Sequence, residues 1–168
     1  MGLVKRLVVA TAGSVILAAI LPSVAATAQT KDSCWDVKPD EKKFVSATNN
    51  FRSRLGKPKY QLDPHLSRAA RLHSREMFKR DLLYHTPGDK LTRCVTNWSM
   101  LGENVGMGYS VESLHDAFIN SPGHRANILE SGFKYFGVGT VEHDGQLWVT
   151  VIFEGSANPG TPLKMPKC

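Results

Sequence analysis

The fold is decided by the stretch Leu147-Trp148-Val149-Thr150-Val151-Ile152-Phe153. Its β-branched and aromatic residues predict a strand. Both alternating sets of side chains are apolar, with Trp148 and Ile152 on one side and Leu147, Val149, Val151 and Phe153 on the other. A strand that is apolar on both faces must be covered on both faces, so the stretch predicts a sheet lying between two helical layers.

The segments on either side of this strand extend the prediction. A partner strand is predicted over residues 135–141, and a turn at His143-Asp144-Gly145 would join the two strands. The tail after the second strand, residues 155–168, contains three prolines and is predicted to be irregular. The last third of the chain therefore supplies a hairpin at the centre of the fold.

Helices are predicted upstream of the hairpin. One begins at Pro39-Asp40-Glu41 and ends at Gly56, with apolar residues at helical spacing between them. Two shorter helices are predicted after the N-cap residues Ser110 and Ser121, and the second of these runs to Leu129. These helices provide the cover that the central strand requires.

A further helix is predicted over residues 64–82 and has two contrasting faces. At 100° per residue, its apolar residues and His73 share one narrow face, which we expect to be buried. The opposite side carries Arg68, Arg71, Arg75 and Lys79. This basic stripe has two interpretations: a solvated helix face, which is the commoner origin of such a pattern, or a surface that binds anionic polymers such as teichoic acids or acidic glycans.

The overall composition is that of one globular domain. The chain has 168 residues, 42% of them hydrophobic and 21% charged, which excludes collagen-like, coiled-coil and wholly disordered proteins. The formal net charge is +6. No phosphate-binding glycine loop and no aromatic nucleic-acid-binding motif is present, so we expect no nucleic-acid partner.

The N-terminus has the features of a secretory signal. Lys5 and Arg6 precede an apolar stretch that ends at Pro22, and Ala26-Thr27-Ala28 matches a signal peptidase site. We expect cleavage between Ala28 and Gln29, and an extracellular product. The apolar stretch is shorter than the roughly 20 residues of a bilayer span, so no transmembrane anchor is expected after cleavage. Removing 28 of the 168 residues leaves 140, with 19 basic and 15 acidic side chains and a charge of +4.

Three cysteines lie after the predicted cleavage position: Cys34, Cys94 and Cys168. Outside the cell, disulfides form and persist, so all three are disulfide candidates. One pair would leave an odd thiol, and spacing alone leaves the pairing open. No Cys-x-x-Cys motif indicates a zinc knuckle or a redox site.

Three residues stand out as candidates for chemistry. His85 follows a helix end, where its side chain is not needed for core packing. His124 lies in the first turn of a helix, and the helix dipole disfavours the imidazolium form there. A neutral imidazole can bind a metal or accept a proton. Glu103 has apolar neighbours, which predicts a partly desolvated carboxylate. His73, on an apolar helix face, is more simply a hydrogen-bonded core residue.

Several separated blocks of sequence resemble a known family, both in their residues and in their order along the chain. The blocks are Asn50-Phe51-Arg52, Ala70-Arg71-Leu72-His73-Ser74-Arg75-Glu76-Met77, Tyr84-His85-Thr86, Gly102-Glu103-Asn104-Val105, Ser121-Pro122-Gly123-His124-Arg125-Ala126-Asn127-Ile128-Leu129 and Phe136-Gly137-Val138-Gly139. Together they resemble a bacterial CAP domain, also called SCP, the superfamily of cysteine-rich secretory proteins, antigen 5 and pathogenesis-related 1 proteins. The resemblance covers roughly residues 44–154.

The resemblance implies a fold and a site. The fold is a three-layer α-β-α sandwich with a small, mainly antiparallel central sheet, placed here at residues 41–155 between an extension, 29–40, and the tail, 156–168. The site is a cleft, in which the family's two histidines correspond to His85 and His124 and one glutamate to Glu103. Ser121 stands where eukaryotic members have a second glutamate, so the tetrad is incomplete. We expect a monomer.

Two functions are compatible with this resemblance. The first, which we favour, is an extracellular binding module whose cleft holds a lipid, a glycan or an anionic cell-envelope ligand. The second is a zinc-assisted hydrolase of peptide or cell-wall material, because two imidazoles and one carboxylate form the ligand set of an open zinc site. Ser121 as a nucleophile is a weaker alternative, since a serine that caps a helix before proline is usually structural.

Overall fold

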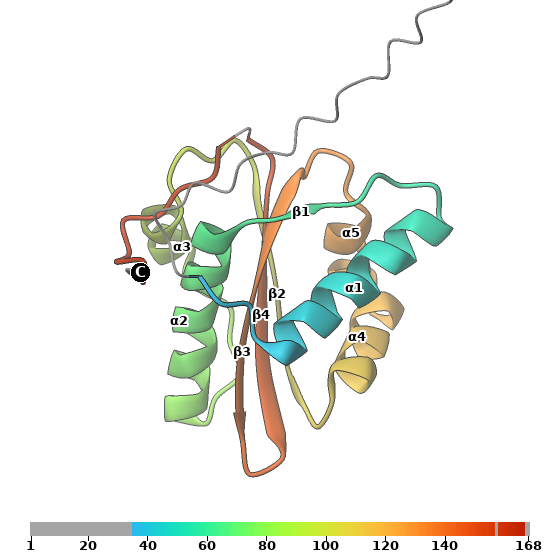
Figure 1. The fold of residues 1–168 in the computed structure, drawn as a ribbon. Coiled ribbons are helices and arrows are strands. Elements are labelled where there is room, and N and C mark those ends of the chain that lie inside the picture. The colour runs from blue at the N-terminus through green and yellow to red at the C-terminus, as the bar shows by residue number, and fades with distance from the viewer. Residues whose placement is uncertain (1–34, 157, 167–168) are drawn as a thin grey trace, which may run out of the picture. The chain divides into compact units, whose positions relative to one another are not determined.

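The computed structural model describes residues 35–156 and 158–166 (Figure 1). In order, its elements are α1 (Pro39–Arg54), β1 (Gln61–Leu62), α2 (Pro64–Arg80), α3 (Gly88–Cys94), β2 (Leu101–Gly108), α4 (Val111–Asn120), α5 (Pro122–Leu129), β3 (Tyr135–His143) and β4 (Gln146–Glu154). The fold is thus a mixed α/β domain in which the hairpin expected from the sequence forms the last two strands.

The four strands form one sheet in the order β1-β3-β4-β2. β4 pairs antiparallel with β3 and with β2, and only the two-residue β1 is parallel, to β3. The β3–β4 turn passes through Asp144 and Gly145, both with positive φ. The predicted small, mainly antiparallel sheet is confirmed.

Helices cover both faces of this sheet. α2 and α3 lie on one side, and α1, α4 and α5 on the other (Figure 1). Side chains from β4 enter both layers: Phe153 packs in a cluster with Phe44 of α1 and Phe118 of α4, whereas Ile152 packs with Leu66 of α2. The three-layer sandwich predicted from the two apolar faces of this strand is therefore confirmed.

Two glycines allow α2 to approach the sheet closely. A Cβ atom on Gly137 would lie 2.2 Å from the backbone of Leu66 and Ser67, and one on Gly139 would lie 2.1 Å from the backbone nitrogen of Arg71. Both distances are far inside van der Waals contact, so only glycine permits this helix–sheet spacing.

A buried carboxylate joins α1 to the other two layers. Glu41, with no exposed surface, accepts hydrogen bonds from Arg71 of α2 and from the backbone nitrogen of Thr140 in β3. The backbone nitrogen of Lys38 also donates to it. The start of the first helix is thereby fixed against a strand from the last third of the chain.

The predicted helix ends agree with the structure to within two residues. Ser110 caps α4, and its hydroxyl accepts from the backbone nitrogen of Ser113. Ser121 occupies the N-cap position of α5, but its side chain makes no capping hydrogen bond. α3, β1 and β2 have no counterpart among the elements predicted from the sequence. None of the described helices has both the length and the apolar composition needed to cross a membrane.

Some predictions fall outside the described residues. They are the signal segment with its cleavage position between Ala28 and Gln29, and two of the cysteines, Cys34 and Cys168. Cys94, at the end of α3, forms no disulfide with a described residue. Disulfide pairing and signal cleavage stay predictions.

Candidate functional site

The structure brings His85 and Glu103 together. Glu103 lies on β2 with its side chain 5% exposed, and His85 lies in the loop after α2 with its side chain 60% exposed. His85 Nδ1 and Glu103 Oε1 are 2.9 Å apart. Because a carboxylate accepts, the imidazole donates from Nδ1, which leaves Nε2 for an external partner.

Thr86 completes the surroundings of this carboxylate. Its backbone nitrogen donates to Glu103 Oε1 over 2.8 Å, and its hydroxyl donates to Oε2 over 2.5 Å. Together with His85, the loop gives Glu103 three donors, so the burial expected from the sequence is compensated by hydrogen bonds. The hydrogen bonds of this carboxylate therefore hold the loop in place and orient His85.

His73 supports the same loop from inside the fold. It is buried on α2, and its Nε2 lies 2.7 Å from the carbonyl oxygen of Tyr84, the residue before His85. The rings of His73 and Tyr84 also meet edge to face, 4.9 Å between centroids. This arrangement agrees with the prediction of a hydrogen-bonded core histidine and gives it a positioning role.

His124 is held by two asparagines that sequence reasoning did not single out as site residues. Asn104 of β2, fully buried, donates from Nδ2 to the carbonyl oxygen of His124. Asn127 of α5 donates to the carbonyl oxygen of Glu103 and to Oδ1 of Asn104. These bonds tie the start of α5 to β2 and so fix His124 relative to Glu103.

The His124 ring is half-buried and lies 4.7 Å from the ring of Phe118, centroid to centroid. Burial, and after it electrostatic repulsion between the imidazolium and nearby His85, lowers the pKa of His124 below its ordinary value. The ring is therefore neutral at physiological pH. The sequence predicted this direction from the helix dipole, but desolvation is the main cause.

Ser121 stands apart from these groups. Within residues 35–156 and 158–166, no hydrogen bond joins its hydroxyl to His85, Glu103 or His124. A serine nucleophile requires a base within hydrogen-bond reach. Ser121 thus occupies the predicted N-cap position of α5, but its hydroxyl makes no capping hydrogen bond to a described residue.

The predicted zinc ligands do not fit as a set of three. Glu103 already accepts from His85 and Thr86, so it acts as the orienting partner of one imidazole. In the part of the chain that the structure describes, no three histidine, cysteine, aspartate or glutamate side chains are placed to hold a metal ion. What the geometry offers an external ligand is Nε2 of His85 and the ring of His124.

The chain matches a known family over most of its described length. A family model of the cysteine-rich secretory protein family, CAP, matches residues 45–153. The chain belongs to this family. The matched segment contains all three residues of the predicted cleft, His85, Glu103 and His124, and all four strands of the sheet except Glu154, the last residue of β4.

Relatives of this CAP domain occur in bacteria. The uncharacterized protein YkwD of Bacillus subtilis (strain 168) is 36% identical over 115 residues, which cover 64% of this chain and 44% of YkwD. The chain thus spans less than half the length of that relative. A solved structure of an extracellular SCP-domain protein from Bacillus anthracis str. Ames is 27% identical with a TM-score of 0.62, covering 70% of this chain and 40% of that one.

The fold extends to a more distant protein of the bacterial surface. An outer surface protein from Borrelia burgdorferi is 18% identical, with a TM-score of 0.65, and the match covers 71% of this chain and 95% of the Borrelia protein. At this identity the likeness shows the CAP fold alone. That fold is therefore shared with extracellular and outer-surface proteins.

Proposed function

We propose that this protein is a secreted binding module that holds a hydroxyl-rich glycan of the cell envelope through its His85–Glu103–His124 cleft. One observation carries the proposal: the carboxylate of Glu103 accepts three hydrogen bonds, all from the loop that contains His85. A carboxylate engaged in this way orients an imidazole and is not available as a base toward a ligand. The oriented imidazole of His85 therefore presents Nε2 in a fixed direction, which suits recognition of a ligand by hydrogen bonding.

The chemistry of the two imidazoles indicates the class of ligand. Nε2 of His85 is left for an external partner, and the ring of His124 is neutral because burial lowers its pKa. Neutral imidazoles can accept hydrogen bonds from hydroxyl groups and donate to them. A glycan offers both partners at closely spaced positions, whereas a lipid chain offers neither.

Cosedimentation with insoluble peptidoglycan tests the proposal. We expect His85→Ala and His124→Ala each to weaken binding about tenfold, the effect of losing one well-formed polar contact in a binding site. His143→Ala is the matched control, because His143 is exposed at the end of β3 and is not one of the three candidate site residues. Unchanged binding of both cleft variants would reject the glycan site, as would binding confined to neutral lipid vesicles.

A zinc-dependent hydrolase is the second candidate function. It is favoured by the hydrogen bond from His85 Nδ1 to a carboxylate, since carboxylates orient zinc-binding histidines in this way. His85 Nε2 and the ring of His124 would hold the ion, which would supply Lewis-acid chemistry. Calorimetric titration of metal-free protein distinguishes the two functions: zinc uptake that His85→Ala weakens supports the hydrolase, and no such uptake supports the binding module.

A further inference from the structure

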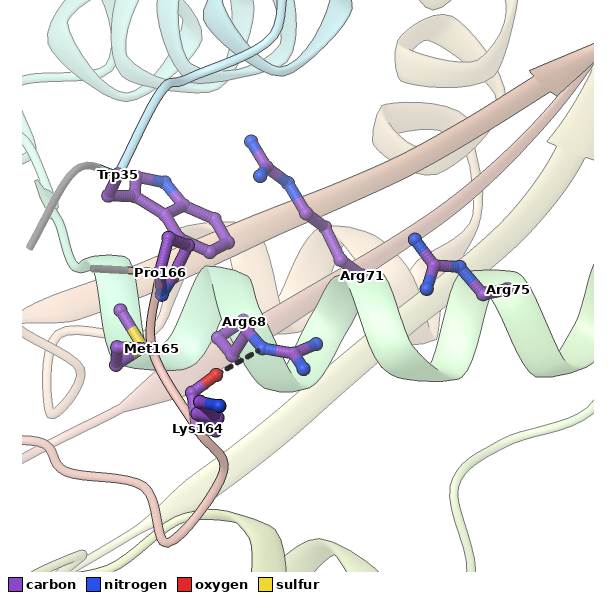
Figure 2. A pocket seen from close by; sticks show the side chains of 7 residues that line it. All are labelled: Trp35, Arg68, Arg71, Arg75, Lys164, Met165 and Pro166. Carbon is purple, nitrogen blue, oxygen red and sulfur yellow. Dashed lines mark hydrogen bonds between the residues drawn. The ribbon is translucent and has the colours of Figure 1, made fainter. Parts of the chain in front are cut away.

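A second site lies on the outer face of α2. A pocket of about 500 Å³ is lined by Arg68, Arg71 and Arg75 of this helix, by Trp35 and by residues 164–166 of the tail. Figure 2 shows the three arginines in a row along the helix, with Trp35 and Pro166 together at one end. This pocket shares no residue with the candidate site of His85, Glu103 and His124.

Arg71 builds the wall of the pocket. Its guanidinium donates to both carboxylate oxygens of Glu41, over 2.5 and 2.6 Å, and to the carbonyl oxygen of Asp36. The same group lies 3.8 Å from the centre of the Trp35 ring. Arg71 is therefore neutralised by Glu41 and serves to hold the indole against the helix.

The other two arginines have no acidic partner within residues 35–156 and 158–166. Arg68 uses Nε to donate to the carbonyl oxygen of Lys164, over 3.0 Å, which leaves its two terminal nitrogens for another partner (Figure 2). Within residues 35–156 and 158–166, Arg75 makes neither a side-chain hydrogen bond nor an ion pair. Among the described residues, no aspartate or glutamate lines the pocket.

We propose that this pocket binds an organic phosphate ester. Arginine presents a planar fork of donors that matches phosphate oxygens, and here two such forks, Arg68 and Arg75, lie on one face of α2 without an acidic partner among the described residues. Trp35, Met165 and Pro166 provide an apolar surface for the organic part of the ester. The volume lies within the roughly 300–1,000 Å³ of small-molecule sites.

The structure separates this pocket from a plain solvated helix face. Lys79 belongs to the same basic stripe in the sequence but does not line the pocket, whereas Arg68, Arg71 and Arg75 do. The difference arises because Trp35 and the tail pack beside the N-terminal half of α2 and border the space there.

Calorimetric titration with phenyl phosphate tests the proposal. We expect saturable binding that is tighter than that of inorganic phosphate, because the ring of the ester can pack on Trp35. Arg68→Ala/Arg75→Ala should weaken binding at least tenfold, since charge-assisted bonds are lost. Lys42→Ala/Lys79→Ala removes the same charge from exposed positions outside the pocket and should change the affinity less than about twofold.

A second arm identifies the source of the phosphate. Binding of phosphatidylglycerol vesicles without binding of phenyl phosphate, lost in the Arg68→Ala/Arg75→Ala variant, would indicate a lipid headgroup. Binding of the soluble ester would indicate a soluble or polymeric phosphate. Equal weakening by the pocket and control variants, or no saturable binding in either arm, would overturn the proposal.

Two further variants keep the test decisive. Arg75→Ala alone replaces the double variant if the latter unfolds, because the Arg75 side chain makes no hydrogen bond or ion pair to another described residue. His85→Ala should bind phenyl phosphate normally, because His85 lies outside the pocket. Failure of this site and failure of the cleft are therefore distinguishable.

Discussion

The buried carboxylate of Glu103 and the exposed imidazole of His85 are joined by a 2.9 Å hydrogen bond, although the two residues lie 18 positions apart in the chain. One end of this contact is in the sheet and the other is at the surface. The stability of the loop and the orientation of the candidate binding group therefore depend on the same side chain.

Replacing Glu103 should destabilise the protein. Glu103→Ala removes the acceptor of three hydrogen bonds and leaves the donors of Thr86 partly buried, so we expect a loss of about 2–3 kcal/mol in the free energy of unfolding. Urea denaturation measures this loss. Glu142→Ala is the control, because Glu142 is exposed and accepts only from Gly145 in a turn. A loss no larger than that of the control would contradict the role given to Glu103.

Asn104 should contribute both to stability and to glycan binding. Asn104→Ala breaks the bond to the His124 carbonyl and the one from Asn127, which should cost about 2 kcal/mol of stability. Glycan binding should fall as in His124→Ala, because the start of α5 is no longer fixed. Asn50→Ala, on the exposed side of α1, should change stability by less than about 0.5 kcal/mol. Normal binding by folded Asn104→Ala would show that His124 does not depend on this network.

The close approach of α2 to β3 makes Gly139 sensitive to any side chain. In Gly139→Ala, the new methyl group would meet the backbone at Arg71, so the helix must move, at a cost of about 3 kcal/mol or more. Thermal denaturation measures this cost. Gly123→Ala in α5 is a suitable comparison, because nothing lies within 4 Å of the position that its methyl group would take and alanine favours a helix. Equal melting temperatures of the two variants would refute the packing argument.

Stability should decrease in mild acid because of His115. This residue is buried between the rings of Phe44 and Phe51, and burial lowers its pKa below the ordinary 6.5, with Asp116 opposing the shift and Arg54 adding to it. The unfolded chain then binds more protons than the folded one, so the free energy of unfolding falls as the pH drops below about 6.5.

His115→Leu provides the measurement of this pH dependence. Between about pH 7.5 and pH 5, the variant should lose less stability than the wild type, as followed by urea denaturation. Part of the slope should remain, because the pKa of His124 is lowered as well. Asn50→Ala, on the exposed side of α1, is the control and should keep the wild-type slope, because asparagine does not titrate. Identical slopes for the two variants would show that His115 is not responsible.

The three layers of the fold were predictable because the sequence of β4 is apolar at alternating positions on both faces of the strand. Apolar residues such as Trp148 and Val149 occupy both faces, and a sheet covered on both sides buries both sets. The cap of α4 was predictable because Ser110 accepts from the backbone nitrogen of Ser113, only three residues further along the chain. Structural features that depend on residues close together in the chain can therefore be predicted from the sequence.

β2 was missed because its glycines serve packing, not a turn. A Cβ on Gly102 would lie 2.7 Å from the ring of Phe133, and one on Gly106 would lie 2.9 Å from Phe118. These clashes involve residues from distant elements, so the segment has the composition of a loop although it is a strand. The three hydrogen bonds to Glu103 were invisible for the same reason, since its donors approach through the tertiary fold.

The links of Glu41 and β1 to β3 have a consequence for how the chain acquires its structure. Glu41 bonds to Thr140, 99 residues later, and Gln61 pairs with Tyr135. The first helix and first strand thus find their partners only when the last third of the chain is present. Folding dominated by such distant contacts is slow. A nascent chain of this protein should therefore stay unfolded until nearly its full length has been synthesised.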